Sequence, residues 1–485
     1  MTAAPRTCAP LFALAITSLC AGATEIPVAT PADIARACDR AKPGDALVMA
    51  EGVWRDADIV FRGRAEAGMP ITLRAQTPGK TILSGRSRLR IAGEHLVVSG
   101  LLFRDGWPND SAIEFRADSK AMASNCRLTG CAIADYSPPT DDAAAKGSKW
   151  VSLYGLSNRV DHCYFTGKKD LGTTLVVWVG DLPNGHRIDH NHFGPRPPLG
   201  RNGGETIRVG TSEVSMSESA TLVEENYFDG CDGEIEVISN KSCGNTYRHN
   251  TFVACTGTLT LRHGNRCSVE GNWFFGNGKR ESGGIRIIGE DHRISNNYLV
   301  GLEGDGARSA ISFQMGLPDS PLHGYFQVKR AAVAFNTIID SKSPLAIGVA
   351  NGDSSNLLAP VDCEIANNLI VCRQGRPPIA LMDPRSQIRW AGNLVAVAPE
   401  GTRLPDGVRH ADLPMRGPAD GVSRPAADGP ARAAATTDAP WVTDDIDGQR
   451  RNGPRDVGCD QTSDAPALHR PLAPKDVGPD WMKRD

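Results

Sequence analysis

Two glutamates with one residue between them, Glu234 and Glu236, have the type and spacing to act together in a chemical site. In an extended strand, successive side chains point to opposite faces, so both carboxylates lie on the face opposite Ile235. Like charges at this spacing repel one another unless a cation lies between them. Lys241 would provide that cation in an ordinary surface ion-pair cluster. The other interpretation is a site for a hard cation such as Ca²⁺, with the Asn202 amide as a third oxygen ligand.

These residues lie within a repeat, in which a short phrase of asparagine, any residue and an apolar residue recurs. Its clear copies begin at Asn191, Asn226, Asn250, Asn272, Asn297, Asn336, Asn368 and Asn393, and looser copies end at Phe103, Ile133 and Phe165. The spacing of 22 to 39 residues indicates a stacked solenoid. Short alternating runs such as Thr258-Leu259-Thr260-Leu261-Arg262 indicate strands, and the pattern of leucine-rich repeats is absent. We therefore predict an all-β, right-handed parallel β-helix of about eleven turns.

The repeat predicts which polar residues meet on one face of the solenoid. Residues at similar distances from the repeated apolar anchor lie side by side, about 4.8 Å apart from turn to turn. In four successive turns, six polar residues lie six to thirteen positions after the anchor: Asn202, Glu234, Glu236, Lys241, Arg262 and Arg286. An amide, two carboxylates, a lysine and two arginines are thus expected on one face.

The repeated asparagines have a structural interpretation. We expect them in tight left-handed bends, with side chains that bond along the stack. An open solenoid end must be covered. Thr30-Pro31-Ala32-Asp33 has the N-cap, proline and acid of a helix start, and Ile34, Ala35 and Cys38 give it an apolar stripe. A short helix is therefore predicted to cap the N-terminal end.

The chain divides into three predicted segments. Residues 1–23 have a basic residue, an apolar run and an A-x-A ending at Ala23, as in a cleaved signal peptide, so the mature protein is expected to be periplasmic or secreted. Residues 24–400 are expected to form the β-helix as one elongated domain, although the length of the chain alone would suggest about three domains. Residues 401–485 are rich in Pro, Gly, Ala and Asp, and are expected to form an irregular tail packed on the solenoid.

The cysteine content and the net charge narrow the kinds of site and partner that the chain could have. Signal cleavage would leave 11 of the 13 cysteines, of which Cys126 and Cys131 are spaced for a local bridge. The four at 231, 243, 255 and 267 have no C-x-x-C or histidine cluster beside them, so we interpret them as buried small hydrophobes. A net charge of −3 argues against a nucleic-acid partner. No apolar run is long enough to keep the mature chain in a membrane.

Several segments in the central turns resemble those of polysaccharide lyase family 6, which contains alginate lyases and chondroitinase B. These segments run from Asn202 to Gly210, from Glu234 to Ser242, from Leu261 to Gly264 and from Gly283 to Gly289. They stand in the family's order, and the resemblance is densest over residues 200–300. The resemblance implies a right-handed parallel β-helix that cleaves an acidic polysaccharide by β-elimination.

The resemblance also implies roles for individual residues. Lys241 matches the family's catalytic base and Arg262 its acid-side residue, while Asn202, Glu234 and Glu236 match its Ca²⁺ ligands. Arg286 and His263 match substrate-contacting positions. Since a guanidinium hardly ever gives up its proton, Arg262 is expected to stabilise the leaving oxygen by charge, with the proton supplied by water or by protonated Lys241.

The implied reaction is the cleavage of alginate to unsaturated uronate oligosaccharides, with Ca²⁺ as cofactor. Dermatan sulfate is the alternative substrate, although a sulfated chain would require more arginines than Arg208, Arg262 and Arg286. A glycoside hydrolase would need one protonated carboxyl, and Lys241 and Arg262 oppose that state. A non-catalytic glycan-binding β-helix would explain the fold but not the polar grouping.

Overall fold

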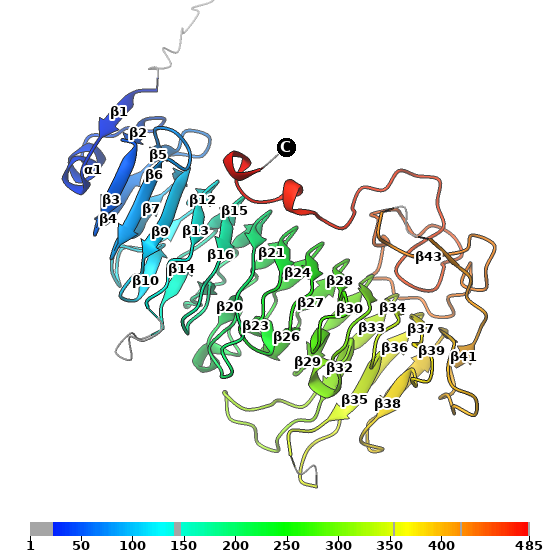
Figure 1. Cartoon of the computed structure of the whole chain (residues 1–485). Coiled ribbons are helices and arrows are strands. Elements are labelled where there is room, and N and C mark those ends of the chain that lie inside the picture. The colour runs from blue at the N-terminus through cyan, green and yellow to red at the C-terminus, as the bar shows by residue number, and fades with distance from the viewer. Residues whose placement is uncertain (1–22, 140–146, 353–354, 418–419, 484–485) are drawn as a thin grey trace, which may run out of the picture.

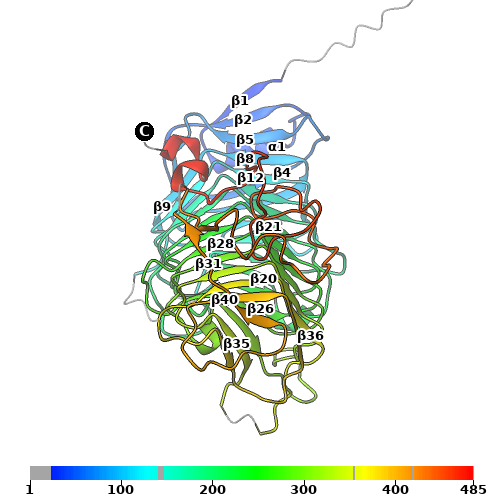
Figure 2. The same cartoon turned by 90° about the vertical axis from the view of Figure 1, so that its right-hand side faces the viewer.

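Three long parallel sheets wind around one elongated core (Figures 1 and 2). The computed structural model describes residues 23–139, 147–352, 355–417 and 420–483. The chain passes through the three sheets in turn and then begins the next coil, so strands that pair are separated by a whole turn. This is the predicted right-handed parallel β-helix.

The first sheet contains 14 strands: β1 (Glu25–Val28), β2 (Ala46–Met49), β5 (Ile71–Ala75), β8 (Leu96–Ser99), β12 (Arg127–Thr129), β15 (Arg159–Asp161), β18 (Arg187–Asp189), β21 (Leu222–Glu224), β24 (Thr246–Arg248), β27 (Ser268–Glu270), β30 (Arg293–Ser295), β33 (Ala332–Ala334), β36 (Cys363–Ala366) and β39 (Ile388–Ala391).

The second sheet carries most of the predicted site residues, and its 13 strands are β4 (Asp58–Arg64), β7 (Arg88–Glu94), β10 (Ser111–Glu114), β11 (Ala123–Ser124), β14 (Lys149–Leu153), β17 (Leu175–Val177), β20 (Ile207–Gly210), β23 (Glu236–Lys241), β26 (Gly257–His263), β29 (Ser282–Ile287), β32 (Ile311–Gln314), β35 (Leu345–Val349) and β38 (Ile379–Leu381).

The third sheet contains 14 strands: β3 (Gly52–Arg55), β6 (Thr81–Gly85), β9 (Leu101–Gly106), β13 (Ala132–Ala134), β16 (Tyr164–Thr166), β19 (His192–Phe193), β22 (Tyr227–Asp229), β25 (Thr251–Val253), β28 (Trp273–Phe275), β31 (Tyr298–Val300), β34 (Thr337–Ile339), β37 (Leu369–Val371), β40 (Asn393–Ala396) and β41 (Val408–His410).

The predicted number of turns is too low, because sheets of 14 strands require more than eleven coils. The sequence contains no asparagine before Asn109, so the first coils carry no copy of the phrase from which turns were counted. At the other end, the third sheet continues to β41, beyond residue 400.

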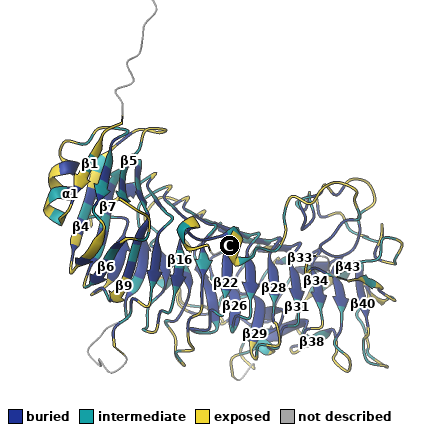
Figure 3. Cartoon of the chain, turned by 45° about the horizontal axis from the view of Figure 1, so that its top comes forward, coloured by how far each residue is buried: buried dark blue, intermediate teal, exposed yellow. Residues whose placement is uncertain are grey.

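The interior consists of side chains stacked in columns along the solenoid axis. Phe193, Phe228, Phe252 and Phe274 occupy matching positions in the third sheet. Their rings stack with centroids 4.9, 4.6 and 4.5 Å apart. The four rings are buried, and Figure 3 colours most of the third sheet as buried. The apolar residue of the repeated phrase therefore builds the core, because each turn buries it against its neighbours.

A ladder of buried asparagines joins the turns next to this core. The side-chain oxygen of Asn272 accepts both the backbone N–H and the side-chain amide of Asn250, each at 3.0 Å. The same pair of bonds links Asn191 to Asn226 and continues turn by turn to Asn393. The predicted bonding along the stack is confirmed, but the left-handed residue is usually the one before each asparagine, such as His190 at φ 53°. The asparagine itself supplies the bonds and its predecessor makes the bend.

A helix covers the N-terminal end, as predicted. Helix α1 (Pro31–Cys38) begins at Thr30, whose hydroxyl oxygen accepts the Asp33 backbone N–H at 3.1 Å. Its buried stripe contains Ala37 in place of the predicted Ala35, which is exposed. None of the helices in the described part of the chain has the length and apolar character to cross a membrane. The predicted signal peptide falls almost entirely on residues 1–22, outside the described residues, and stays a prediction.

After β41 the chain runs back over the solenoid (Figure 1). This C-terminal segment, residues 411–483, contains the short antiparallel pair β42 (Met415–Arg416) and β43 (Arg424–Pro425) and two 3₁₀ turns, Pro474–Asp476 and Asp480–Met482. From Cys459 onwards its hydrogen-bond partners lie on progressively earlier coils. The Cys459 N–H donates to Thr337 Oγ1 at 2.9 Å, and the Trp481 indole donates to the Gly130 carbonyl at 2.8 Å.

The predicted local bridge between Cys126 and Cys131 is wrong. All 11 cysteines in the described residues are free and buried. Cys126 and Cys131 lie in successive corners of one coil, each beside the backbone of the previous coil. The cysteines at 231, 243, 255 and 267 are the buried small residues that their context predicted.

Candidate active site

Irregular strand pairing in the second sheet brings Lys241 and Arg262 together. Along β23 and β26, Asn240 is paired with Leu261 but the next pair is Lys241 with His263, so Arg262 is an extra residue on β26. A second irregularity makes Val237 the extra residue on β23, directly after Glu236. Such bulges bend a strand and re-aim its side chains, which is why they are common beside active sites.

Three carboxylates converge beside this irregular pairing. One oxygen each from Glu205, Glu234 and Glu236 lies within 4.8 Å of the other two. Glu205 lies two residues before the start of β20 and is 1% exposed. The Gly203 backbone N–H donates to Glu234 at 3.3 Å, and the Ser239 hydroxyl donates to Glu236. We refer to these three carboxylates as the acidic cluster.

The acidic cluster has the properties of a cation site. Glu205 Oε2 and Glu234 Oε1 are buried with no hydrogen-bond partner, although buried polar atoms normally have one. Burial, together with the negative charges of Glu205 and Glu236, raises the pKa of the Glu234 carboxyl to about 8. A hard divalent cation prefers carboxylate oxygens and would satisfy both unpartnered atoms. The residues present therefore fit such an ion.

The sequence missed Glu205. It follows Asn202 by three residues and lies within the Asn202–Gly210 segment, but its offset from the anchor was not considered. Asn202 is exposed and lines the same cavity as Glu234 and Glu236, with no hydrogen bond between its side chain and the acidic cluster. A search of that segment for carboxylates within two residues of the start of the strand would have found Glu205. The predicted role of Asn202 as a ligand stays a prediction.

Three cations surround the acidic cluster. Lys241 Nζ lies 3.7 Å from Glu205 Oε1. Arg262 Nε and Arg286 Nη1 lie 3.7 and 3.8 Å from Glu236 Oε1. The structure thus brings together the two glutamates, the lysine and the two arginines that the repeat placed on one face.

A long connection from a later coil completes the site. Residues 315–331 link β32 to β33, and the Gly324 and His323 carbonyls accept hydrogen bonds from Arg262 at 2.7 and 3.2 Å. The Arg262 guanidinium carbon lies 4.0 Å from the centre of the Tyr325 ring. The Tyr325 hydroxyl accepts a hydrogen bond from Arg286 at 3.2 Å. Tyr325 could not be predicted from the sequence, because the connection that carries it lies outside the repeat.

Five of the residues described above line an open cavity of about 580 Å³: Glu234, Glu236, Arg262, Arg286 and Tyr325. Such a cavity holds small charged groups of a larger ligand and leaves the rest of that ligand on the open face. The cations would attract an anionic ligand, while the acidic cluster would repel it unless a metal ion is bound.

His263 is placed differently from the other predicted residues. It is 1% exposed and packs between Ser212, Arg262 and Phe326. Burial, together with the positive charges of Arg262 and Lys241, lowers the pKa of the His263 imidazole to about 3. This placement supports Arg262 from within the protein, and the predicted contact of His263 with substrate stays a prediction.

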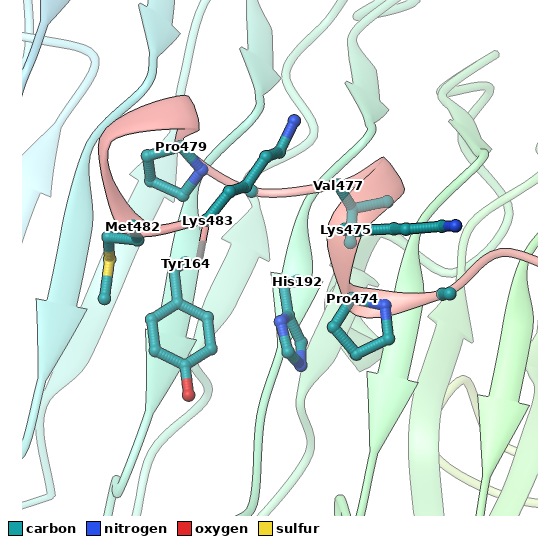
Figure 4. Close-up of a pocket in the computed structure, with 10 residues that line it drawn as sticks. Tyr164, His192, Pro474, Lys475, Val477, Pro479, Met482 and Lys483 are labelled. Atoms are coloured by element: carbon teal, nitrogen blue, oxygen red, sulfur yellow. The ribbon is translucent and has the colours of Figure 1, made fainter. Parts of the chain in front are cut away.

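A second concave surface, of about 510 Å³, lies where the end of the C-terminal segment crosses the third sheet (Figure 4). Tyr164 and His192 form one side, and Pro474, Lys475, Val477 and Pro479 form the other. It contains none of the predicted site residues. The acidic cluster and its cations are therefore the candidate active site.

Comparisons with known proteins show which family model and which solved structures the chain resembles. A family model described as chondroitinase B matches residues 28–431. The solved structure of AlyGC, a PL6 family alginate lyase, is 39% identical with a TM-score of 0.83, and the match covers 95% of this chain but 59% of AlyGC. The chain therefore spans little more than half of the length of that protein.

Two further structures match over most of their length. A mannuronic acid specific polysaccharide family 6 lyase from human gut microbiota is 33% identical, with a TM-score of 0.74 and coverage of 81% of this chain and 92% of that one. The PL6 family polysaccharide lyase Pedsa3628 from Pseudopedobacter saltans is 25% identical, with a TM-score of 0.72 and coverage of 94% and 100%. No curated protein sequence matches the chain.

Proposed function

Because the chain belongs to polysaccharide lyase family 6, the family of chondroitinase B, we propose that it cleaves an acidic polysaccharide by β-elimination. Alginate is the proposed substrate and Ca²⁺ the proposed cofactor. The observation that carries the proposal is the position of Lys241 and Arg262 on either side of a bulged strand pair, next to three carboxylates with unpartnered oxygens.

Elimination from a uronate chain removes the proton on C5, next to the carboxylate, and expels the oxygen on C4. Lys241 is the proposed base, and it must be uncharged to accept the C5 proton. Its Nζ lies 3.7 Å from Glu205 Oε1, and its strand β23 is paired with β20 on one side and β26 on the other, so its position is set before substrate arrives.

The acidic cluster is the proposed metal site. Glu205, Glu234 and Glu236 would hold Ca²⁺, with Asn202 close enough in sequence and space to join them. The bound ion would supply charge that stabilises the electron density developing beside the substrate carboxylate. The chain's own contribution is to keep three carboxylates together at a cost that only a cation offsets.

Arg262 and Arg286 are proposed to act as fixed positive charges on the leaving-group side. Arg262 is held by two carbonyls, the Tyr325 ring and Glu236. Arg286 is 3% exposed and is held by Gln314, Tyr325 and Glu236. Preorganised donors of this kind stabilise charge as it forms, because they need no reorganisation during the reaction.

Alginate is preferred over dermatan sulfate because the structural relatives above 30% identity are an alginate lyase and a mannuronic acid specific lyase. Dermatan sulfate remains the second candidate, since the matching family model is named for chondroitinase B. We also propose that the protein is exported, as its N-terminal sequence predicts.

One experiment tests the reaction class and the substrate together. The protein is incubated with alginate, dermatan sulfate or pectate, with Ca²⁺ or with a chelator, and the ultraviolet absorbance of the unsaturated product is followed. We expect absorbance to rise with alginate and Ca²⁺ and to stay low with the chelator. New reducing ends without absorbance would indicate a hydrolase, and binding without either signal would indicate a glycan-binding protein.

A further inference from the structure

Expulsion of the C4 oxygen leaves an alkoxide that needs a proton, and the roles proposed above do not supply it. Arg262 is the nearest cation on that side, but a guanidinium keeps its proton under all ordinary conditions. Water or protonated Lys241 is the source that the sequence predicts, but a protein group in the same cavity, placed beside the two arginines, would supply the proton directly.

Tyr325 is in that position. It lines the cavity with Glu234, Glu236, Arg262 and Arg286, and its ring lies 4.0 Å from the Arg262 guanidinium carbon. The Arg286 guanidinium carbon lies 5.5 Å from the same ring. The Tyr325 backbone is held as well, because its carbonyl accepts the Leu317 N–H at 2.7 Å. The phenol is thus fixed between two cations.

The direction of one hydrogen bond leaves the phenol hydrogen free. A guanidinium has only donors, so Arg286 donates to the Tyr325 oxygen at 3.2 Å and leaves the phenol O–H without a role in that bond. Among the described residues, no hydrogen bond uses the phenol as donor. The O–H can therefore turn to a substrate oxygen in the cavity.

We propose that Tyr325 is the catalytic acid that protonates the leaving oxygen, a role that rests on the proposed function. Lys241 takes the C5 proton, and the electron pair of the C5–H bond forms the C4–C5 double bond. The C4–O4 bond breaks, and O4 leaves with its electron pair and takes the phenol proton. Tyr325 remains as a phenolate beside Arg262 and Arg286, whose charges stabilise it. The proton on Lys241 returns to the phenolate through solvent, which resets both residues.

Tyr325→Phe distinguishes the role of the hydroxyl from that of the ring, because phenylalanine lacks the hydroxyl but keeps the ring surface on which Arg262 stacks. On alginate, we expect kcat to fall about 10²- to 10⁴-fold with little change in KM, the range typical of a lost general acid. Tyr164→Phe is the matched control, since it removes a phenol hydroxyl from the groove under the C-terminal segment (Figure 4). That variant should keep the activity of the unchanged protein.

A second substrate shows whether the hydroxyl donates a proton or only positions Arg262. A 4-deoxy-4-fluoro uronoside loses fluoride, which leaves without protonation, and gives an unsaturated uronate with the same absorbance. Tyr325→Phe should cleave this substrate at nearly the rate of the unchanged protein. Equal losses on both substrates, or full activity on alginate, would overturn the proposal. If the unchanged protein forms no unsaturated product, the proposed function itself fails, and the role of Tyr325 with it.

Discussion

Lys241 Nζ lies 3.7 Å from Glu205 Oε1, so the proposed base contacts a carboxylate of the proposed metal site. Lys241 is paired with Gly210 at the end of β20, and Glu205 lies two residues before the start of that strand. Base and metal site therefore share one side chain, and a change in Glu205 should affect both.

Lys241→Ala should abolish the formation of unsaturated product. A general base typically contributes about 10²- to 10⁴-fold to the rate, and alanine leaves no group to accept the C5 proton. The measurement is the initial rate of absorbance increase with alginate and Ca²⁺. Lys329→Ala is the control, because Lys329 pairs with Glu290 outside the site. Retained turnover in the Lys241 variant, with an unchanged melting temperature, would rule out this lysine as the base.

Glu234→Gln should affect stability in opposite directions with and without Ca²⁺. In chelator, the Glu234 carboxyl must bind a proton when the chain folds at neutral pH, because burial and the charges of Glu205 and Glu236 raise its pKa to about 8. An amide needs no proton, so the variant should melt at a higher temperature than the unchanged protein. With Ca²⁺, the variant should gain less stability, because one charged ligand is lost. Excess Ca²⁺ should partly restore its activity. Glu218→Gln, at a largely exposed ion pair with Arg266, should show neither effect.

Glu205→Gln tests the ligand that the sequence did not predict. We expect weaker Ca²⁺ binding by calorimetry and also a lower kcat at saturating Ca²⁺, because the carboxylate that positions Lys241 Nζ is lost. A variant with normal Ca²⁺ affinity would remove Glu205 from the metal site. The two readings distinguish a metal ligand from a residue that only positions the base.

The asparagine ladder should be most sensitive to change in its interior. Asn272→Ala removes a side chain that accepts from Asn250 and donates to Asn297, so groups on both neighbouring turns lose a partner. Each buried group left unpaired costs about 1–3 kcal/mol. Asn393→Ala, at the end of the ladder, affects groups of the preceding turn only, namely Asn368 and the Ile365 carbonyl. Urea unfolding should show the larger loss of stability for Asn272→Ala, and equal losses would contradict a continuous ladder.

His292 should make the protein sensitive to acid. Its Nδ1 accepts the Cys267 N–H at 3.2 Å, its Nε2 bonds to the Ile288 carbonyl at 2.9 Å, and burial lowers the pKa of its imidazole to about 4. The unfolded chain takes up this proton near pH 6.5 and the folded chain does so only near pH 4. The stability that the neutral ring contributes is therefore complete above pH 6.5 and is lost as pH falls towards 4.

His292→Asn should reduce that loss. Asparagine offers an uncharged acceptor, as Asn245 does for the Thr221 N–H at the corresponding corner. The variant should be less stable at pH 7.5, because the ring packing is lost, but its urea midpoint should change less between pH 7.5 and 5. His410→Asn, at an exposed position, should leave the pH dependence unaltered. A variant with unchanged acid sensitivity would show that other groups control it.

The repeat made much of this structure predictable. The repeated phrase at Asn191, Asn226 and later positions sets the register of each coil. The number of residues from this phrase then predicts the stacked phenylalanines, the asparagine ladder and the face that carries Glu234 and Lys241. The N-cap at Thr30 is equally local, since it depends on four adjacent residues.

The remaining features depend on contacts that the spacing of the repeat does not predict. The bulge that makes Arg262 an extra residue arises from how two strands fit together. Tyr325 reaches the site from a connection that varies in length and has no place in the repeat. Glu205 lies before the strand rather than in it, where alternation gives no direction for a side chain. The proposed chemistry therefore combines repeated positions with three exceptions to the repeat.

The C-terminal segment changes how such a molecule matures. In a plain solenoid each coil rests only on its neighbours, so early coils can reach their final stability while later ones are still being made. Here Trp481 bonds to Gly130, 351 positions earlier in the chain. The surface of the coil around Gly130 is therefore closed only after a residue 351 positions later has been synthesised, so removal of Trp481 would expose a region made much earlier.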